Sequence, residues 1–196
     1  RSCTPARARR LQQAEIVDVQ KIWDAGRHNA FTDLIRFNDH WICTFREGSH
    51  HGNAEDGNVR IIASEDGKDW KSWALLKSAD GDLRDPKISI TPDGQLMMDT
   101  VLAFVKPDDG VRHRSQTFFS KDGKTWEGPI AKGDDNFWLW RSTWHKAKGH
   151  KDHCYVVGYR TTLPREQRIT RLYRSDDGRE FESYVDQLYD EGAAGE

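Results

Sequence analysis

Three aspartates of this chain lie at a regular spacing and could do chemistry, and each occurs in a Ser-x-Asp-Gly-x-x-aromatic motif. The copies begin 56 and 55 residues apart. Such carboxylates could bind a metal ion or act as acids and bases. A turn explains the same residue types without a ligand: the Asp accepts backbone N–H groups, the Gly supplies a positive φ angle, and the aromatic ring returns to a core. We therefore predict three structural turns. The motif residues are Ser64, Asp66, Gly67 and Trp70; Ser120, Asp122, Gly123 and Trp126; and Ser175, Asp177, Gly178 and Phe181.

The elements that position these turns repeat with the same period. Each unit contains four short segments rich in aromatic and β-branched residues and bounded by Gly, Pro, Asn or Asp, which is typical of β-strands. Repeats of roughly 40–50 residues built from short strands indicate propeller blades. We predict an all-β fold with four antiparallel strands in each unit, and a single strand over 137–145. The expected blades span about 27–78, 83–132 and 136–190, within a partial propeller over 21–196; residues 1–20 are expected to be a leader remnant or a flexible arm.

Composition excludes some classes of partner. The formal net charge is -2, whereas a protein that binds nucleic acid through its phosphates has a basic surface. No run of 18 apolar residues could span a membrane. Cys43 and Cys154 lie in apolar runs that favour buried thiols, and the histidines near Cys154 fit no closed zinc pattern. We therefore expect no metal and no cofactor. The compartment stays open, with secretion or the periplasm favoured if a signal peptide has been removed.

The turns and strands together resemble a known group of proteins. Three Ser-x-Asp-Gly-x-x-Trp/Phe turns on four-stranded units resemble the Asp boxes, or bacterial neuraminidase repeats, of the sialidase superfamily. Further stretches resemble a bacterial sialidase-like subgroup: HNAFTDL at 28–34, FREG at 45–48, DLRDPKISITPDGQLMM at 82–98 and FWLWR at 137–141. The likeness runs from about Gly26 to the C-terminus. It implies a sialidase-like β-propeller of six blades, of which this chain, with about three, looks like the N-terminal half.

The resemblance also implies the place of a catalytic site. In a propeller, the start of each first strand and the loop after each second strand open on one face, and the Asp boxes open on the other. In sialidases the general acid or base is an aspartate in the loop after the second strand of blade one. Asp56 holds that place here, and the alternative is an ordinary Asp-Gly turn. Glu196 falls where the superfamily has a glutamate that activates a tyrosine nucleophile. That tyrosine, and the Arg-Ile-Pro stretch that opens blade one in sialidases, have no counterpart in this sequence.

Arginines and aromatic residues on the same face could bind a substrate. Arg46, Arg84 and Arg141 come from successive units and could capture a carboxylate or sugar hydroxyls, or else form ion pairs between blades. Trp140, with Trp138 and Phe31, could form an aromatic platform for a sugar or pack in the core. The expected substrate-binding residues are His28, Asp33, Arg46, Glu47, His50, Arg84, Asp85, Trp140 and Arg141.

Two classes of function follow from this resemblance. The first is a sialidase-like glycoside hydrolase, exo-acting on a terminal sugar with sialic acid as one candidate, or the N-terminal half of such an enzyme. The alternative is a non-catalytic propeller that binds glycans or a protein partner. Because a half propeller has two open edges, we expect a homodimer if the half propeller is the natural chain.

Overall fold

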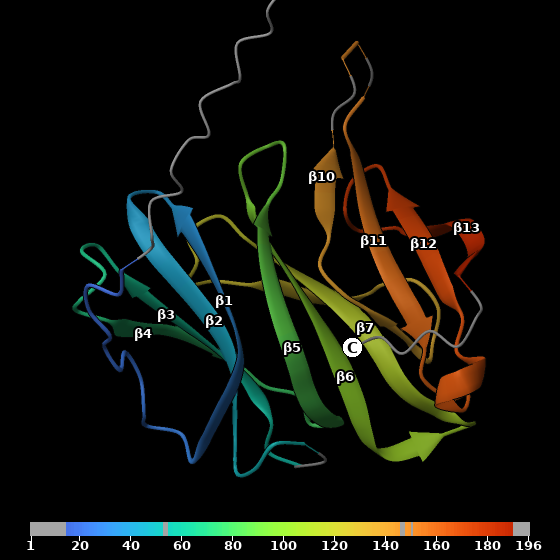
Figure 1. The fold of residues 1–196 in the computed structure, drawn as a ribbon, viewed down its shortest axis with the longest axis horizontal. Helices are drawn as coiled ribbons and strands as arrows, with labels where there is room; N and C mark the ends of the chain where they lie inside the picture. Colours follow the sequence, from blue (N-terminus) through green and yellow to red (C-terminus); the bar gives the residue numbers. More distant parts are fainter. Residues whose placement is uncertain (1–14, 53–54, 146–147, 150, 190–196) are drawn as a thin grey trace, which may run out of the picture.

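The computed structural model describes residues 15–52, 55–145, 148–149 and 151–189, and these form three antiparallel sheets (Figure 1). Blade one has the strand order β1-β2-β3-β4, and blade two has the order β5-β6-β7-β8. Blade three has the order β10-β11-β12-β13, with β9 also paired to β11. The predicted all-β fold of four-stranded antiparallel units is confirmed. The strands are β1 His28–Phe37, β2 His40–Gly48, β3 Asn58–Ser64, β4 Lys71–Leu76, β5 Gly81–Ile90, β6 Leu96–Asp108, β7 Val111–Ser120, β8 Glu127–Ala131, β9 Phe137–Leu139, β10 Thr143–His145, β11 His153–Arg160, β12 Thr170–Ser175 and β13 Glu182–Tyr189.

Blade three departs from the prediction in its first strand. The single strand expected over 137–145 is divided into β9 and β10. Leu139 pairs with Gly158 and Thr143 pairs with Tyr155, so three residues of the first strand stand opposite two of β11. The extra residue interrupts the ladder, as in a β-bulge. A short 3-10 helix, η1 (Arg165–Gln167), lies between β11 and β12.

The three motif turns contain the hydrogen bonds predicted from the sequence. In the first turn, Lys68 N and Asp69 N donate to Asp66 Oδ1 at 2.8 and 2.9 Å, and Ser64 Oγ donates to the same oxygen at 2.9 Å. Gly67 has a φ of 77°, which favours glycine. The backbone N–H groups, that of Asp69 foremost, lower the pKa of Asp66 to about 2. The carboxylate charge is therefore balanced inside the turn.

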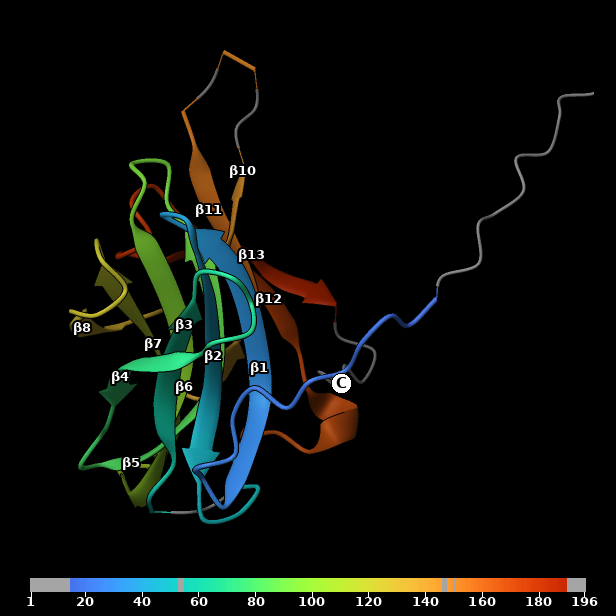
Figure 2. The same cartoon turned by 90° about the vertical axis from the view of Figure 1, so that its left-hand side faces the viewer.

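Apolar side chains pack between neighbouring blades. One cluster joins Ile42 and Val59 of blade one to Leu83 and Leu96 of blade two. The motif ring of Trp126 packs at the margin of this cluster. The sequence predicts a ring that returns to the core, and in the structure this ring is half-buried. Figure 2, in which blade one faces the viewer, shows the four strands of that blade side by side.

The second blade interface combines apolar packing with a buried ion pair. Met97 of blade two packs with Cys154 of blade three. Lys132, after β8, donates to Asp99 Oδ1 at 2.6 Å and to Ser142 Oγ of blade three at 2.5 Å, and all three side chains are buried. Because a buried charge is costly unless it is paired, this network ties blade two to blade three.

The two cysteines in the described part of the chain belong to the core. Cys43 and Cys154 are both buried and free, and burial raises the pKa of each to about 11. The described residues contain no helix with the length and apolar character needed to cross a membrane.

The chain before β1 covers part of the outward face of blade one. Ile22 and Trp23 pack on the cluster of Cys43 and Phe45. The Trp23 ring lies 6.2 Å from that of Phe45, and its Nε1 donates to Glu47 Oε2 at 2.9 Å.

Candidate functional site

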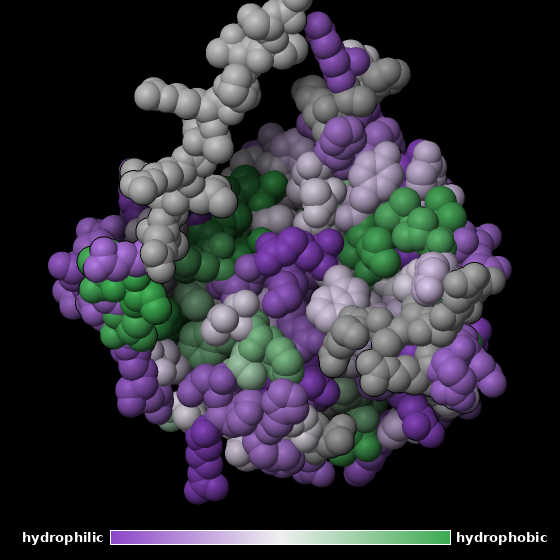
Figure 3. Space-filling view, in the orientation of Figure 1, coloured by the Kyte–Doolittle hydropathy of each residue, from purple (hydrophilic) through white to green (hydrophobic). Residues whose placement is uncertain are grey.

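The first strands of the three blades converge, and one set of contacts joins them. Arg141 Nη2 of blade three donates to Asp33 Oδ1 of blade one at 2.5 Å, and Arg141 Nη1 donates to Ile88 O of blade two at 3.2 Å. Ile88 N donates to Asp33 Oδ2 at 2.8 Å. In Figure 1 these strands face the viewer, and in the same orientation hydrophilic side chains gather at the middle of the face, with apolar patches to either side (Figure 3). The predicted residues Asp33 and Arg141 are thus together, but each is engaged by the other.

Arg84 lies between two aromatic rings from the other blades. Its Cζ is 5.4 Å from the ring centroid of Phe31 in β1 and 5.3 Å from that of Trp138 in β9. Its Nε is buried without a hydrogen-bond partner. Among the described residues, no carboxylate forms an ion pair with Arg84. Since the faces of the guanidinium contact aromatic rings, its in-plane N–H groups are the ones left to recognise a ligand.

Two residues beside Arg84 have a backbone conformation that L-residues rarely adopt. Phe31 has a φ of 60° and Asp85 a φ of 49°. Each falls in a bulge at the matching point of its blade, between Ala30 and Asp33 or between Arg84 and Lys87. Asp85 Oδ2 accepts a hydrogen bond from Trp138 Nε1 at 3.1 Å. Strained residues of this kind concentrate at functional sites. The four side chains Phe31, Arg84, Asp85 and Trp138 are called the inner-strand cluster below.

Histidines surround this cluster. The His51 ring is 5.2 Å from that of Phe31 and 5.3 Å from that of His28. His113 of β7 packs its ring 5.3 Å from Trp138. His50, predicted to bind substrate, instead accepts Arg46 Nη1 at its carbonyl and contacts Ser49 Oγ through Nδ1 at 2.8 Å. The sequence predicts that His50 and His51, as a pair in the loop after β2, hydrogen-bond a substrate, but it gives no signal for His113, because no motif marks that residue.

Two expected substrate-binding residues are committed to other contacts. Arg46 is fully buried in an ion pair with Asp82 of blade two, so its contacts are those of the alternative, ion pairing between blades. Glu47, the next residue, points to the opposite side of the sheet, as alternation requires. There it accepts Arg60 Nη2 at 2.7 Å as well as the Trp23 indole, and the Arg60 hydrogen bond is the main cause that lowers its pKa.

Asp56 lies apart from the inner-strand cluster. It is exposed, and its Oδ1 accepts Ser49 N at 3.1 Å and Ser49 Oγ at 2.9 Å. These hydrogen bonds, the backbone one first, lower the pKa of Asp56. With Arg27 and Asn58 it lines a shallow pocket of about 180 Å³. Glu196, the other expected catalytic residue, lies outside the described residues.

Trp140 is placed for packing more than for stacking on a ligand. It adjoins the buried cluster of Val101, Trp138 and Tyr159, and its ring is tilted at 6.2 Å from that of Tyr159. The core-packing alternative therefore describes Trp140 in this structure.

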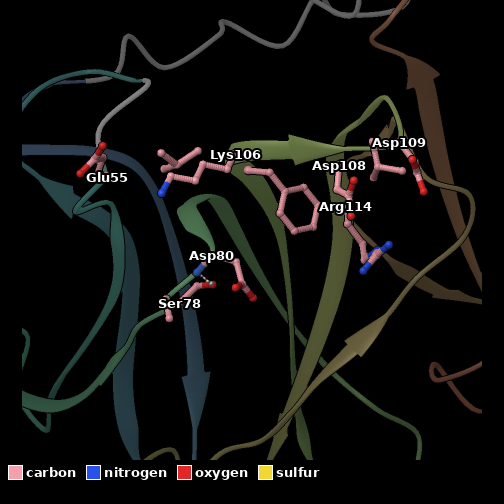
Figure 4. Close-up of a pocket in the computed structure, with 11 residues that line it drawn as sticks. Glu55, Ser78, Asp80, Lys106, Asp108, Asp109 and Arg114 are labelled. Atoms are coloured by element: carbon pink, nitrogen blue, oxygen red, sulfur yellow. Dashed lines mark hydrogen bonds between the residues drawn. The ribbon is translucent and has the colours of Figure 1, made fainter.

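A larger hollow lies on the rim between blades one and two (Figure 4). It has a volume of about 820 Å³ and is formed by the link from β4 to β5 together with the β6–β7 hairpin. Phe104 and Val105 supply apolar surface, and Asp80 and Lys106 supply charge. None of the residues predicted from the sequence to bind substrate lines it. In the described part of the chain, no three His, Cys, Asp or Glu side chains are grouped so that they could hold a metal.

Comparison with known proteins identifies the architecture. No family model matches this chain, and no curated protein matches its sequence. A protein of unknown function from Dyadobacter fermentans matches with a TM-score of 0.61 and 20% identity, over 80% of this chain and 54% of that one. An α-L-arabinofuranosidase from Fusarium graminearum, solved with an iminosugar inhibitor, matches with a TM-score of 0.61 and 17% identity. The match covers 84% of this chain and 50% of that one. An α-L-arabinanase from Penicillium chrysogenum, solved with arabinobiose, matches with a TM-score of 0.59 and 18% identity. The match covers 83% of this chain and 50% of that one.

The fold is that of a β-propeller. The chain spans about half the length of these structures. At this level of identity the likeness shows the fold alone, so the β-propeller places β1, β5 and β9–β10 as inner strands and leaves the chemistry to the residues on them.

Proposed function

We propose that this chain is part of a sialidase-like glycoside hydrolase that acts on a terminal sugar, and that its inner-strand cluster holds the sugar. The observation that carries the proposal is the Arg84 guanidinium, which lies between Phe31 and Trp138 with no carboxylate partner among the described residues. A half-buried, unpaired guanidinium suits a carboxylate or a pair of hydroxyls, because both match its in-plane donors. Sialic acid offers both groups.

Two further observations support this proposal. Propellers of similar fold include an arabinofuranosidase and an arabinanase solved with sugar-like or sugar ligands. The strained backbone at Phe31 and Asp85 lies beside Arg84, where a ligand would contact the inner strands. Acid-assisted departure of the aglycone is the reaction that such a site would serve, with Asp56 as the proposed acid or base.

A second candidate function is glycan binding without hydrolysis. Asp56 favours it, because the Ser49 hydrogen bonds lower the pKa of its carboxyl, whereas a general acid needs a raised pKa. Among the described residues, Asp56 also forms no hydrogen bond with the inner-strand cluster.

Hydrolysis of a panel of aryl glycosides by the full natural protein separates the candidates. The panel includes the 4-nitrophenyl sialoside and α-L-arabinofuranoside. Turnover that is lost in both Asp56→Asn and Arg84→Gln, but kept in the control Arg36→Gln, supports the hydrolase. Arg36 stacks on Trp41 beside the first motif turn, away from the cluster. Saturable binding without turnover supports the second candidate. Neither binding nor turnover with any member of the panel would overturn both.

A further inference from the structure

The hydrogen bonds around His113 fix which ring nitrogen carries its proton. Thr161 Oγ1 donates to Asn136 O at 2.9 Å, because a carbonyl oxygen can only accept. That uses the single proton of the hydroxyl. The contact of 2.8 Å between Thr161 Oγ1 and His113 Nδ1 therefore needs a proton on Nδ1. In the neutral ring, Nε2 is then left with a free lone pair.

The same residues hold the ring in place across the interface of blades two and three. Asn136 N donates to His113 O at 2.8 Å, and His113 N approaches Asn136 Oδ1 at 3.3 Å. The ring packs against Trp138 at 5.3 Å, with the planes inclined by 62°. No described residue hydrogen-bonds to Nε2, and this atom is not among the buried nitrogens without a partner. Its lone pair thus reaches solvent next to the inner-strand cluster.

Burial, together with neighbouring positive charges, favours the neutral form of the His113 imidazole. Burial is the main cause that lowers the pKa of His113, followed by the positive charges of Arg84, Arg112 and Arg168. Asp85, the carboxylate of the inner-strand cluster, accepts the Trp138 indole N–H. At neutral pH the ring is an acceptor at Nε2.

We propose that His113 Nε2 accepts a hydrogen bond from a hydroxyl group of the sugar held at the inner-strand cluster. This binding role deepens the proposed function and rests on it. An arginine can only donate, so a site built on Arg84 alone cannot satisfy a hydroxyl proton. His113 supplies the complementary acceptor. The ligand that fits is one that carries an acceptor, such as a carboxylate, and a hydroxyl within reach of both residues.

Two substitutions of His113 test whether the acceptor at Nε2 is needed. His113→Asn keeps an N–H that can donate to Thr161 but has no atom at the position of Nε2. His113→Gln can extend a carbonyl oxygen to that position. With the 4-nitrophenyl sialoside and α-L-arabinofuranoside as probes, we expect His113→Asn to weaken binding about tenfold and His113→Gln to stay within about threefold of wild type. The matched control is His40→Asn, because the His40 ring contacts Asn38 O and, in the first motif turn, Glu65 Oε1.

Nitrogen NMR of the histidine ring gives a readout that needs no ligand. We expect an unprotonated Nε2 in the free protein and a shift of that signal when the sugar binds. Because the pKa of His113 is lowered, affinity should fall only at a pH below the ordinary imidazole pKa of about 6.5, where the ring becomes protonated and has no acceptor. A proton on Nε2, or equal affinity of His113→Asn and wild type, overturns the His113 role and leaves the proposed function standing. If neither probe binds the wild type, the proposed function fails and the His113 role fails with it.

Discussion

Arg46 and Asp82 form a bidentate ion pair that joins blade one to blade two. Arg46 Nε donates to Asp82 Oδ1 at 2.7 Å and Nη2 donates to Oδ2 at 2.9 Å, and the two side chains are 0% and 2% exposed. Gly57 closes over the pair: a Cβ atom there would lie 1.6 Å from Asp82 Oδ1. The pair is thus sealed from solvent, and its role is to hold two blades together.

Removing one charge of this pair should lower the free energy of unfolding much more than replacing both residues by apolar ones. Asp82→Asn leaves a buried guanidinium without its counter-charge, so we expect a loss of about 3–5 kcal/mol in the free energy of unfolding. The double variant Arg46→Met with Asp82→Leu removes both charges and should recover much of that loss. Urea denaturation of the three proteins measures this. If the double variant loses as much free energy of unfolding as the two single substitutions together, the two residues do not act as a pair.

The contrast between Arg46 and Arg84 shows how far the sequence could lead. Both arginines were expected to bind substrate, and nothing near them in the sequence distinguishes them. Arg46 is paired with a residue 36 positions away, and Arg84 meets rings of two other blades. Which arginine finds a carboxylate depends on how the sheets pack, a long-range property that local patterns do not contain.

The motif turns were predictable for the opposite reason. The hydrogen bonds of Asp66 go to residues two and three positions away, so the motif itself determines the geometry. The strands were predictable in the same local way, from their aromatic and β-branched residues and from the turn residues that bound them. The contacts of His113 could not be predicted in this way, because its partners Trp138, Asn136 and Thr161 all belong to blade three.

The turns should make stability sensitive to acid. The folded-state pKa of Asp66 is about 2, below the unfolded value, so the ionised carboxylate favours the folded state. Its contribution is fully present above the unfolded pKa of about 3.9 and is lost as the pH falls through about 2. Asp66→Asn should therefore lower the melting temperature at pH 7, and the difference from wild type should shrink near pH 2. A difference that does not change with pH would show that the charge is not involved.

The motif rings should contribute less to stability than enclosed aromatic residues do. Trp126 packs on the core between blades one and two but is half-buried, so we expect Trp126→Ala to cost about 2–3 kcal/mol. Phe181 packs on two clusters and lies beneath Lys132 Nζ at 4.7 Å, so its loss should cost at least as much. The exposed Tyr189, replaced by Ala, is the control for a ring outside the core. Chemical denaturation that gives equal losses at all three positions would contradict this ranking.

Arg84 should matter for binding and little for folding. Its known contacts are two cation–π interactions, worth about 0.5–1 kcal/mol each at partly exposed sites. We expect Arg84→Lys to keep the fold and the charge but to lower sugar affinity about tenfold, because an ammonium has no planar pair of donors. Isothermal titration with the sialoside, beside a thermal melt, measures both quantities. Full affinity in the lysine variant would show that charge alone is sufficient.

The outward faces of the first and last blades should drive self-association of this 196-residue chain. Blade one exposes Leu34 (53%) and Trp41 (38%) on its outward face, and blade three exposes Val157 (37%) and Tyr184 (51%). Apolar faces of this kind are covered at the two interfaces inside the chain. Two copies joined head to tail would cover both faces and close a ring if each spans half the circle. We therefore predict that sedimentation equilibrium gives a dimer, not a 22.6 kDa monomer.

Charge substitutions on each face test how such a dimer is joined. Leu34→Glu and Val157→Glu alter different faces, and a head-to-tail ring needs both, so each variant alone should shift the dimer to monomer. Val105→Glu, at an exposed position on the β6–β7 hairpin outside both faces, should leave it intact. A compact wild-type monomer with a cooperative melt would overturn the association. A dimer that survives both face variants would overturn only the ring, because its interface would then lie elsewhere on the surface.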